Sequence, residues 1–143
     1  MQDLHRWNTV LHRYATKFLD KELETLGLNY SYAQYILHIC IIEGIEQEKL
    51  TSHLNVHRSS VTRAISYLIE NGFVIKKNCL ADKRTNQLFP TKKAQDAYIC
   101  IQQAKEKWNN IISSNFTQEE ITQFFTLLQK AKNNAYEYLY PSK

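Results

Sequence analysis

Apolar side chains recur at the spacing of a helix face along most of the chain, so the pattern predicts a mainly helical protein. The first such stripe consists of Leu4, Trp7, Leu11, Tyr14 and Phe18, continued by Leu23 and Leu26. It predicts a helix over residues 3–26 that ends at Gly27, a residue type suited to the left-handed conformation after a helix. A helix this long need not bury its whole stripe in one domain, and part of it can face a partner chain.

Three shorter helices are predicted next. Ser31 is a suitable N-cap for a helix over 32–43, whose nearly continuous apolar run predicts burial on most sides. Residues 47–54 predict a short helix, 55–56 a turn, and 57–70 another helix. One face of this last helix is apolar and carries Val61, Ile65, Leu68 and Ile69. Its other face is polar and basic and carries Arg58, Ser59, Thr62, Arg63 and Ser66.

A hairpin follows, because Asn71-Gly72 stops the helix and short apolar runs flank a charged loop. Residues 73–77 and 87–89 predict two strands joined by the loop 80–86, and Pro90 ends their pairing. Ile45-Glu46, earlier in the chain, is long enough for at most a minimal strand.

Two long helices complete the chain. Thr91 can cap the first, whose apolar positions repeat from Ala94 to Ile112. Thr117 and Glu120 have the spacing of a capping box at the start of the second. The predicted fold class is therefore α+β, mostly α, with one small hairpin.

Composition also favours a single domain of long helices. The 143 residues suffice for one domain with a core, and only 3 Gly and 2 Pro favour long helices. No apolar run approaches the length of a membrane span, and the N-terminus lacks the layout of a signal peptide, so we expect a cytoplasmic protein.

Charge is unevenly distributed along the chain. Residues 47–93 contain nine basic and three acidic side chains, a net charge of +6, while the rest carries −2. A basic middle third between acidic flanks suggests a polyanionic partner, although a solvated lysine-rich surface would give the same count.

The predicted order helix, tight turn, helix, hairpin is that of a winged helix-turn-helix, and its side chains fit DNA as the polyanionic partner. Ser, Thr and Arg on the leading face of a helix suit the major groove of DNA, where Arg can bind guanine bidentately. Arg84, in the hairpin loop, can enter the minor groove, and Asp82 can orient its guanidinium or tie down the loop.

These residues resemble the helix-turn-helix of the MarR family of bacterial regulators. The resemblance is carried by the run from Leu50 to Arg63, by Ile69-Glu-Asn-Gly72-Phe73-Val74 and by Asp82-Lys83-Arg84. It covers nearly the whole chain and implies a winged helix-turn-helix over 31–91 between dimerisation helices at 1–30 and 92–143. It also implies a homodimer that represses transcription from pseudo-palindromic operators and is released by a small ligand. The chain departs from the family pattern at Phe89 to Ala94, where Leu-Thr-x-x-Gly is usual.

The resemblance and the residue chemistry together give a predicted DNA interface. Bases and adjacent phosphates in the major groove would be met by Ser59, Ser60, Thr62 and Arg63, and the minor groove by Arg84 with Asp82. Backbone phosphates would be met by Lys49, His57, Arg58, Lys76, Lys77 and Lys83, with His53 as a further candidate.

A ligand pocket is predicted where the first, second and fifth helices meet. Its candidate residues are Trp7, Leu11, Tyr14, Tyr32, Tyr35, His38, Tyr98 and Ile101. In the resembling family such a pocket takes small aromatic or phenolic ligands, and Arg13 could pair with a ligand carboxylate. Plain core packing is the alternative, because aromatic stripes usually belong to the core.

Redox and metal sensing are weaker hypotheses. Tyr32-Ala33-Gln34-Tyr35 resembles the Tyr-Pro-Gln-Tyr of the family's organic-hydroperoxide sensors, but Val10 stands where those sensors have their reactive cysteine. Cys40 and Cys100 lie in apolar stripes and are expected to be buried, whereas Cys79 is the most exposed of the three. The predicted fifth helix, where metal-sensing members of the resembling family have their ligands, contains no histidine, so we expect no metal and no cofactor.

Two other classes of function remain open at this point. No nucleophile–base pattern, glycine-rich phosphate loop or H-E-x-x-H motif occurs, so an enzyme is not expected. A winged helix that binds another protein instead of DNA is one alternative, and a thiol-based redox-responsive regulator is the other.

Overall fold

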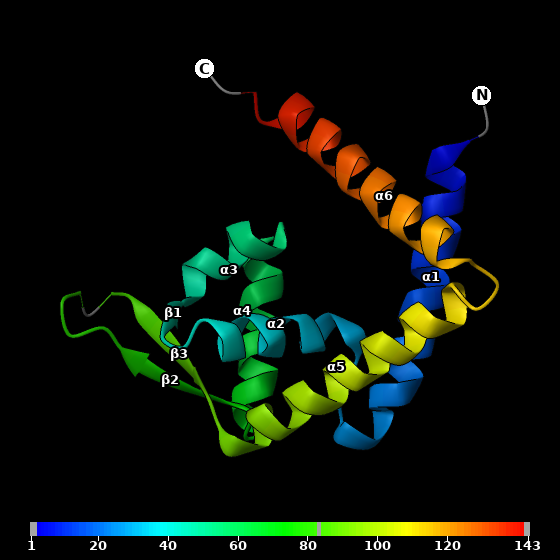
Figure 1. The fold of residues 1–143 in the computed structure, drawn as a ribbon. Helices are drawn as coiled ribbons and strands as arrows, with labels where there is room; N and C mark the ends of the chain where they lie inside the picture. The colour runs from blue at the N-terminus through cyan, green and yellow to red at the C-terminus, as the bar shows by residue number, and fades with distance from the viewer. Residues whose placement is uncertain (1–2, 83, 142–143) are drawn as a thin grey trace. The chain divides into compact units, whose positions relative to one another are not determined.

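The computed structural model describes residues 3–82 and 84–141 and confirms the predicted fold class, mostly helical with one small antiparallel sheet (Figure 1). The elements in chain order are α1 (Leu4–Leu23), the 3-10 turn η1 (Glu24–Leu26), α2 (Tyr30–Ile41), β1 (Ile45–Glu46), α3 (Gln47–Leu54), α4 (Arg58–Glu70), β2 (Val74–Asn78), β3 (Asn86–Pro90), α5 (Lys92–Ile112) and α6 (Gln118–Leu139). Contacts divide the chain into a unit over 1–108 and a unit over 109–143.

The ends of α1 and α2 are set by local backbone chemistry. Gly27 has φ +69°, in the left-handed region, and its N–H donates to the carbonyl of Glu24, which ends the first helical segment as predicted. The predicted cap of α2 was wrong. Asn29 is the N-cap, and its side-chain oxygen accepts from the N–H of Tyr32 at 2.8 Å. Asn is as good a cap as Ser, so composition alone did not separate the two positions.

The sheet has three strands in the order β1-β3-β2, all pairs antiparallel. β3 pairs with β1 through Ile45 opposite Leu88, and with β2 through Ile75 opposite Phe89. The two residues Ile45-Glu46 therefore do form a minimal strand. Pro90, which cannot donate to a ladder, is the last residue of β3 and lies opposite Val74.

The core of the 1–108 unit is apolar and joins every element of that unit. Its most enclosed side chains, each at 2% exposure or less, include Leu23, Ile36, Ile39, Leu50, Ile65, Leu68, Phe73, Leu88 and Ile101. One prediction of burial was wrong. Ile69 of α4 is 37% exposed and Ala64 takes the inward place instead. α2 is buried on most sides as predicted, through Ala33, Tyr35, Ile36, Leu37 and Ile39, but Ile41 and Ile42 at its end are 67% and 41% exposed.

α5 is fixed to α1 within the same unit. Lys107 forms an ion pair with Glu22 at 2.8 Å, and Phe18 lies 5.5 Å from Trp108 between ring centroids. At the other end of α5, the Thr91 hydroxyl donates to the carbonyl of Gly72 at 2.7 Å, which links the start of α5 to the end of α4. These contacts attach one end of α5 to α1 and the other to the end of α4.

The 109–143 unit contains the end of α5 and the whole of α6. The predicted capping box is present, since Thr117 accepts from the N–H of Glu120 and the Glu120 carboxylate accepts from the N–H of Thr117. The Phe116 and Phe124 rings pack edge to face at 5.8 Å. No residue of α6 is buried, although its sequence carries many apolar side chains.

No helix within residues 3–82 and 84–141 is both long and apolar enough to cross a bilayer.

Candidate nucleic-acid interface

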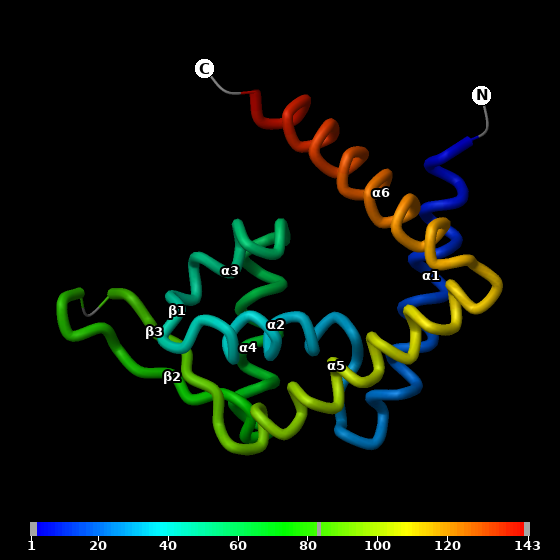
Figure 2. Tube along the Cα trace, viewed as in Figure 1, coloured from blue at the N-terminus to red at the C-terminus, as the bar shows by residue number. Residues whose placement is uncertain are grey.

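α3 and α4 are joined by a tight turn that sets the direction of α4 (Figure 2). Asn55 ends α3 with φ +51°, a conformation that Asn tolerates better than most residues. The N–H of Val56 then donates to the carbonyl of Thr51 at 3.1 Å. Leu50, fully buried, holds α3 on the core, and the first residues of α4, Arg58 to Ser60, are exposed.

The first turns of α4 present a polar, basic face to solvent. His57 is the N-cap residue, and its carbonyl accepts from the N–H groups of Ser60 and Val61. Val61, Ala64, Ile65 and Leu68 are buried, which fixes the rotation of the helix. The predicted contact residues on this helix are all exposed, namely Arg58, Ser59, Ser60, Thr62 and Arg63, as is His57 before them.

Arg58 is not a free cation. Its guanidinium donates to the Glu48 carboxylate of α3 at 3.0 Å, and both side chains are highly exposed, at 81% and 74%. This pair was not predicted, because ten residues separate the partners along the chain. An exposed pair of this kind is weak and salt-sensitive, so Arg58 can exchange Glu48 for another anion at small cost.

β2, β3 and the loop between them form the wing. The N–H of Cys79 donates to the carbonyl of Thr85 at 2.8 Å, and the N–H of Thr85 to the carbonyl of Asp82 at 3.0 Å. The Asp82 carboxylate accepts from the backbone N–H of Arg84 at 2.9 Å. Of the two roles considered for Asp82, the structure therefore shows loop closure. Lys83 lies outside the described residues.

The wing loop and the helix-turn-helix enclose a small polar niche of about 100 Å³. It is lined from α3 by Gln47, Glu48 and Thr51, from α4 by Arg58, Val61 and Thr62, and from the wing by Arg84, Thr85 and Asn86. The niche brings Arg84 to the same side of the molecule as Arg58 and Thr62. The side-chain oxygen of Gln47 is buried there without a hydrogen-bond partner among the described residues.

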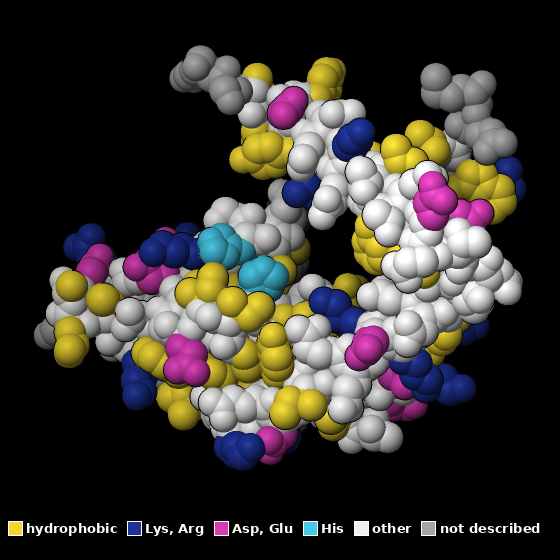
Figure 3. Space-filling view, viewed as in Figure 1, with side chains coloured by type: hydrophobic (Ala, Val, Ile, Leu, Met, Phe, Trp, Pro, Cys, Tyr) yellow, Lys and Arg dark blue, Asp and Glu magenta, His cyan; other side chains and the backbone are white. Residues whose placement is uncertain are grey.

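The predicted phosphate-contacting lysines that the structure describes lie on α3 and β2. Lys49 pairs with Glu46 at 3.3 Å, and Lys76 is exposed on β2. The Lys77 ammonium lies 5.0 Å from the centroid of the Phe89 ring. Figure 3 shows basic, acidic and histidine side chains side by side over α3 and the wing. The surface is thus mixed in charge.

A second cavity, of about 410 Å³, lies between α1, α2 and the α3–α4 turn. Its lining consists of His12, Thr16, Tyr30, Ser31, Gln34, Tyr35, Leu54 and Val56. The side-chain nitrogen of Gln34 is buried without a hydrogen-bond partner among the described residues. Burial, and to a smaller extent the neighbouring Tyr32, raises the pKa of Tyr35 above its ordinary value, so Tyr35 stays a protonated donor.

Only part of the predicted pocket set meets at this cavity. Tyr35 lines it, while Tyr32 stacks on Tyr67 instead. Trp7 and Tyr14 are 60% and 62% exposed on α1, and Leu11 is half-buried there.

The remaining predicted pocket residues lie elsewhere in the same unit. His38 hydrogen-bonds the Gln34 carbonyl at 2.9 Å with its ring 6.2 Å from His53, Tyr98 packs on the core, and Ile101 is fully buried. Arg13 is exposed on α1. Sequence reasoning missed His12, Thr16 and Gln34, although His12 and Thr16 share a helix face at i, i+4 spacing.

The thiols depart from the predicted order of exposure. Cys40 is half-buried, and burial, followed by the nearby Glu43 carboxylate, raises its pKa. The expectation for Cys100 was wrong, because Cys100 is exposed while Cys79 is half-buried. The buried stripe of α5 is Ala94, Ala97, Ile101 and Ala104, and Cys100 lies one helical step outside it. Within residues 3–82 and 84–141, no three His, Cys, Asp or Glu side chains are grouped to hold a metal ion.

A helix-turn-helix followed by a two-stranded wing, with an exposed basic face on its second helix, defines a winged helix-turn-helix protein. Residues 41–85 match the sequence profile of the MarR family. The chain is 30% identical over 134 residues to the HTH-type transcriptional regulator YybA of Bacillus subtilis, covering 94% of this chain and 89% of that one.

Solved structures agree with this assignment. One is a MarR family transcriptional regulator of Listeria monocytogenes complexed with 26-mer DNA, 32% identical with a TM-score of 0.85, covering 100% of this chain and 99% of that chain. Another is the MarR protein of Peptoclostridium difficile, 29% identical with a TM-score of 0.90, covering 100% and 94%. The chain belongs to the MarR family of transcriptional regulators.

Proposed function

We propose that this regulator is a homodimer that binds a pseudo-palindromic DNA operator and represses transcription until a small ligand releases it. The observation that carries the proposal is the start of α4, where exposed Ser59, Ser60, Thr62 and Arg63 lie on a helix whose other face is buried. The chain would act by binding rather than by catalysis. The DNA complex of the related Listeria regulator supports the same use of the fold.

α4 and the wing, which carry Arg63 and Arg84, would each contact one groove of the DNA. α4 would enter the major groove, with Arg63 reading base edges and the serine and threonine hydroxyls meeting bases or phosphates. Arg84, on a loop closed by Asp82, would enter the minor groove beside it. Lys49, His57, Arg58, Lys76, Lys77 and Lys83 would contact phosphates, which position the protein without reading sequence.

The helices outside 31–91 would form the dimer. α1 exposes Leu4, Trp7 and Tyr14 at 75%, 60% and 62%, and α6 exposes Leu127, Leu128 and Tyr136 at 62%, 46% and 62%. Exposed apolar stripes of this size mark an interface in a folded protein. Two recognition helices would then face half-sites about 34–36 Å apart.

The cavity between α1, α2 and the α3–α4 turn is the proposed effector site. Its polar lining includes the Gln34 amide nitrogen, which has no hydrogen-bond partner among the described residues and can donate to a ligand oxygen. Its apolar wall includes Leu54 and Val56. A small aromatic ligand with an oxygen substituent fits this combination. Because Val56 belongs to the turn before α4, a ligand there can shift the recognition helix.

Arg84→Ala should weaken binding to the cognate operator by about 1–3 kcal/mol without unfolding the protein, the scale of one lost groove contact. Fluorescence anisotropy with the gene's own upstream region would measure this, and circular dichroism would check the fold. Lys92→Ala, on the exposed start of α5, provides a control for the loss of one positive charge. Equal affinity of Arg84→Ala and the wild type would remove Arg84 from the interface and undermine the proposed reading of DNA.

Glu48→Gln should strengthen operator binding by about 2- to 5-fold, because it releases Arg58 from its ion pair and removes a negative charge near DNA. Glu106→Gln makes the same change of net charge on the exposed surface of α5 and should have a smaller effect. The comparison is best made at low and moderate salt in the same anisotropy assay. If both substitutions raise affinity equally, the Glu48–Arg58 pair has no specific part in DNA binding.

A further inference from the structure

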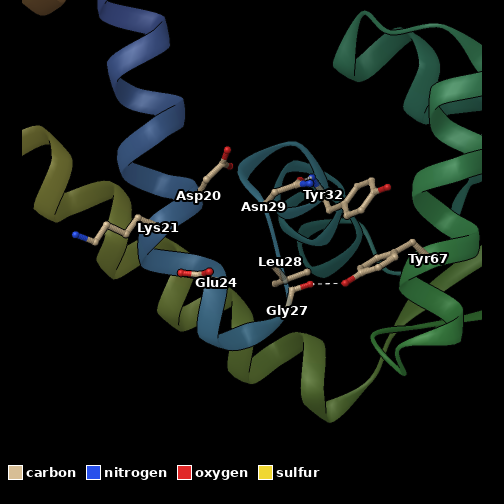
Figure 4. A pocket seen from close by; sticks show the side chains of 8 residues that line it. All are labelled: Asp20, Lys21, Glu24, Gly27, Leu28, Asn29, Tyr32 and Tyr67. Atoms are coloured by element: carbon tan, nitrogen blue, oxygen red, sulfur yellow. Dashed lines mark hydrogen bonds between the residues drawn. The ribbon is translucent and has the colours of Figure 1, made fainter.

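A third depression, of about 550 Å³, lies on the side of α2 that faces α4 (Figure 4). It is bounded by the end of α1, the loop that leads into α2, and the aromatic rings of Tyr32 and Tyr67. All of these residues belong to the 1–108 unit. The proposed effector cavity has an entirely different lining, so the two are separate sites.

Two stacked tyrosines form the aromatic wall of this depression. The Tyr32 ring of α2 and the Tyr67 ring of α4 lie 4.6 Å apart between centroids at 28°. The Tyr67 hydroxyl donates to the carbonyl of Gly27 at 2.6 Å, which holds its ring in place. Both side chains are half-buried, so the pair is ordered and still accessible to a ligand.

The opposite wall carries negative charge. Asp20 and Glu24 follow each other at i, i+4 spacing on the last turns of the first helical segment, and both line the depression. One Asp20 oxygen accepts from the N–H of Tyr30 at 2.7 Å, which fixes the carboxylate. Figure 4 shows that the Asp20 side chain projects from α1 into the opening, whereas the Lys21 side chain extends away from the two tyrosines.

We propose that this depression, which we call the Tyr32–Tyr67 site, binds an organic cation with an aromatic body. The ammonium group would lie against the Asp20 and Glu24 carboxylates, and the aromatic body would pack against the tyrosine pair. Aromatic faces and carboxylates both attract such a cation. The aromatic wall also favours a ligand with an apolar body over an inorganic ion. An anion would meet two carboxylates and is disfavoured.

Benzyltrimethylammonium, benzyl alcohol and benzoate provide a matched set of probes. Each has one aromatic ring, and they are positively charged, neutral and negatively charged, respectively. Saturation-transfer NMR and titration on the full chain should show benzyltrimethylammonium binding that weakens at least about fivefold in the double variant Asp20→Asn/Glu24→Gln. Asn keeps an oxygen that can accept from the Tyr30 N–H, so the fold is preserved. Benzyl alcohol binding should be unchanged by the double variant, and benzoate binding should strengthen, because the two carboxylates that repel it are neutralised.

Glu106→Gln is the control for loss of an acidic side chain elsewhere in the same unit, and it should leave the binding of the cation unchanged. Glu24→Gln alone, at an exposed position, keeps the test available if the double variant is unstable. The proposal is overturned if the cation binds no better than benzyl alcohol, or if loss of Asp20 and Glu24 charge leaves its affinity unchanged. Neither outcome depends on DNA binding, so the proposed function is tested separately.

Discussion

Leu128→Glu should convert the proposed dimer into a monomer and weaken operator binding by about 10²- to 10⁴-fold, whereas Gln129→Glu should change neither property. The two positions are adjacent on α6 and the substitutions introduce the same charge. Leu128 continues the apolar stripe that begins at Ile121 and Phe124, while Gln129 does not. The predicted difference therefore tests the stripe rather than the helix as a whole.

The physical reason is that the described part of the chain leaves the apolar side chains of α6 largely uncovered. None of its residues is buried, and Leu127, Leu128 and Leu139 are 62%, 46% and 64% exposed. Burying one such leucine in an interface contributes about 1.5–3 kcal/mol, and a buried unpaired carboxylate costs more than that gain. A monomer would also meet only one half-site, which removes the avidity of a two-site contact.

Light scattering coupled to size exclusion would measure the mass of each variant, and anisotropy with operator DNA would measure the affinity. Helical content by circular dichroism shows whether α6 still forms. A Leu128→Glu protein that stays dimeric and keeps wild-type affinity would exclude this face of α6 from the interface. Loss of the dimer in both variants would point instead to a general intolerance of α6 to negative charge.

The helices and the hairpin were predictable because their signals are periodic and local. The turn at Asn55, the stop at Gly72 and the capping box at Thr117 all depend on residues within a few positions of one another. The cap of α2 was placed two residues late, because both Asn29 and Ser31 have the right chemistry and only the backbone chooses between them. The winged helix-turn-helix and its exposed arginines followed from such local patterns.

Contacts between distant segments were beyond the same reasoning. Nothing in the sequence pairs Glu48 with Arg58, or the Tyr67 hydroxyl with the carbonyl of Gly27 forty residues away. The predicted pocket combined aromatic residues from helix faces whose rotation was unknown, and the structure separates Tyr32 from Tyr35 onto two cavities. A helix turns by about 100° per residue, so an error of one residue in the predicted buried face moves a side chain to another side of the helix.

The rotation of α2 about its own axis decides which of its isoleucines are buried, and this predicts a large difference in stability between two variants. Ile39→Ala should lower the free energy of unfolding by about 2–5 kcal/mol, whereas Ile41→Ala should change it by less than about 0.5 kcal/mol. Both replace isoleucine by alanine on the same helix, two residues apart. Ile39 is 0% exposed in the core and Ile41 is 67% exposed, although both belong to one apolar run in the sequence.

The cost at Ile39 has two parts, the lost transfer of buried methyl groups from water and the cavity that rigid neighbours leave open. At Ile41 neither part applies, and alanine has the higher helix propensity, which offsets any lost contact. Urea unfolding should be followed at one fixed protomer concentration, because the stability of a dimer depends on it. Comparable destabilisation by the two substitutions would show that the end of α2 is covered in solution, by a partner chain or by another part of this one.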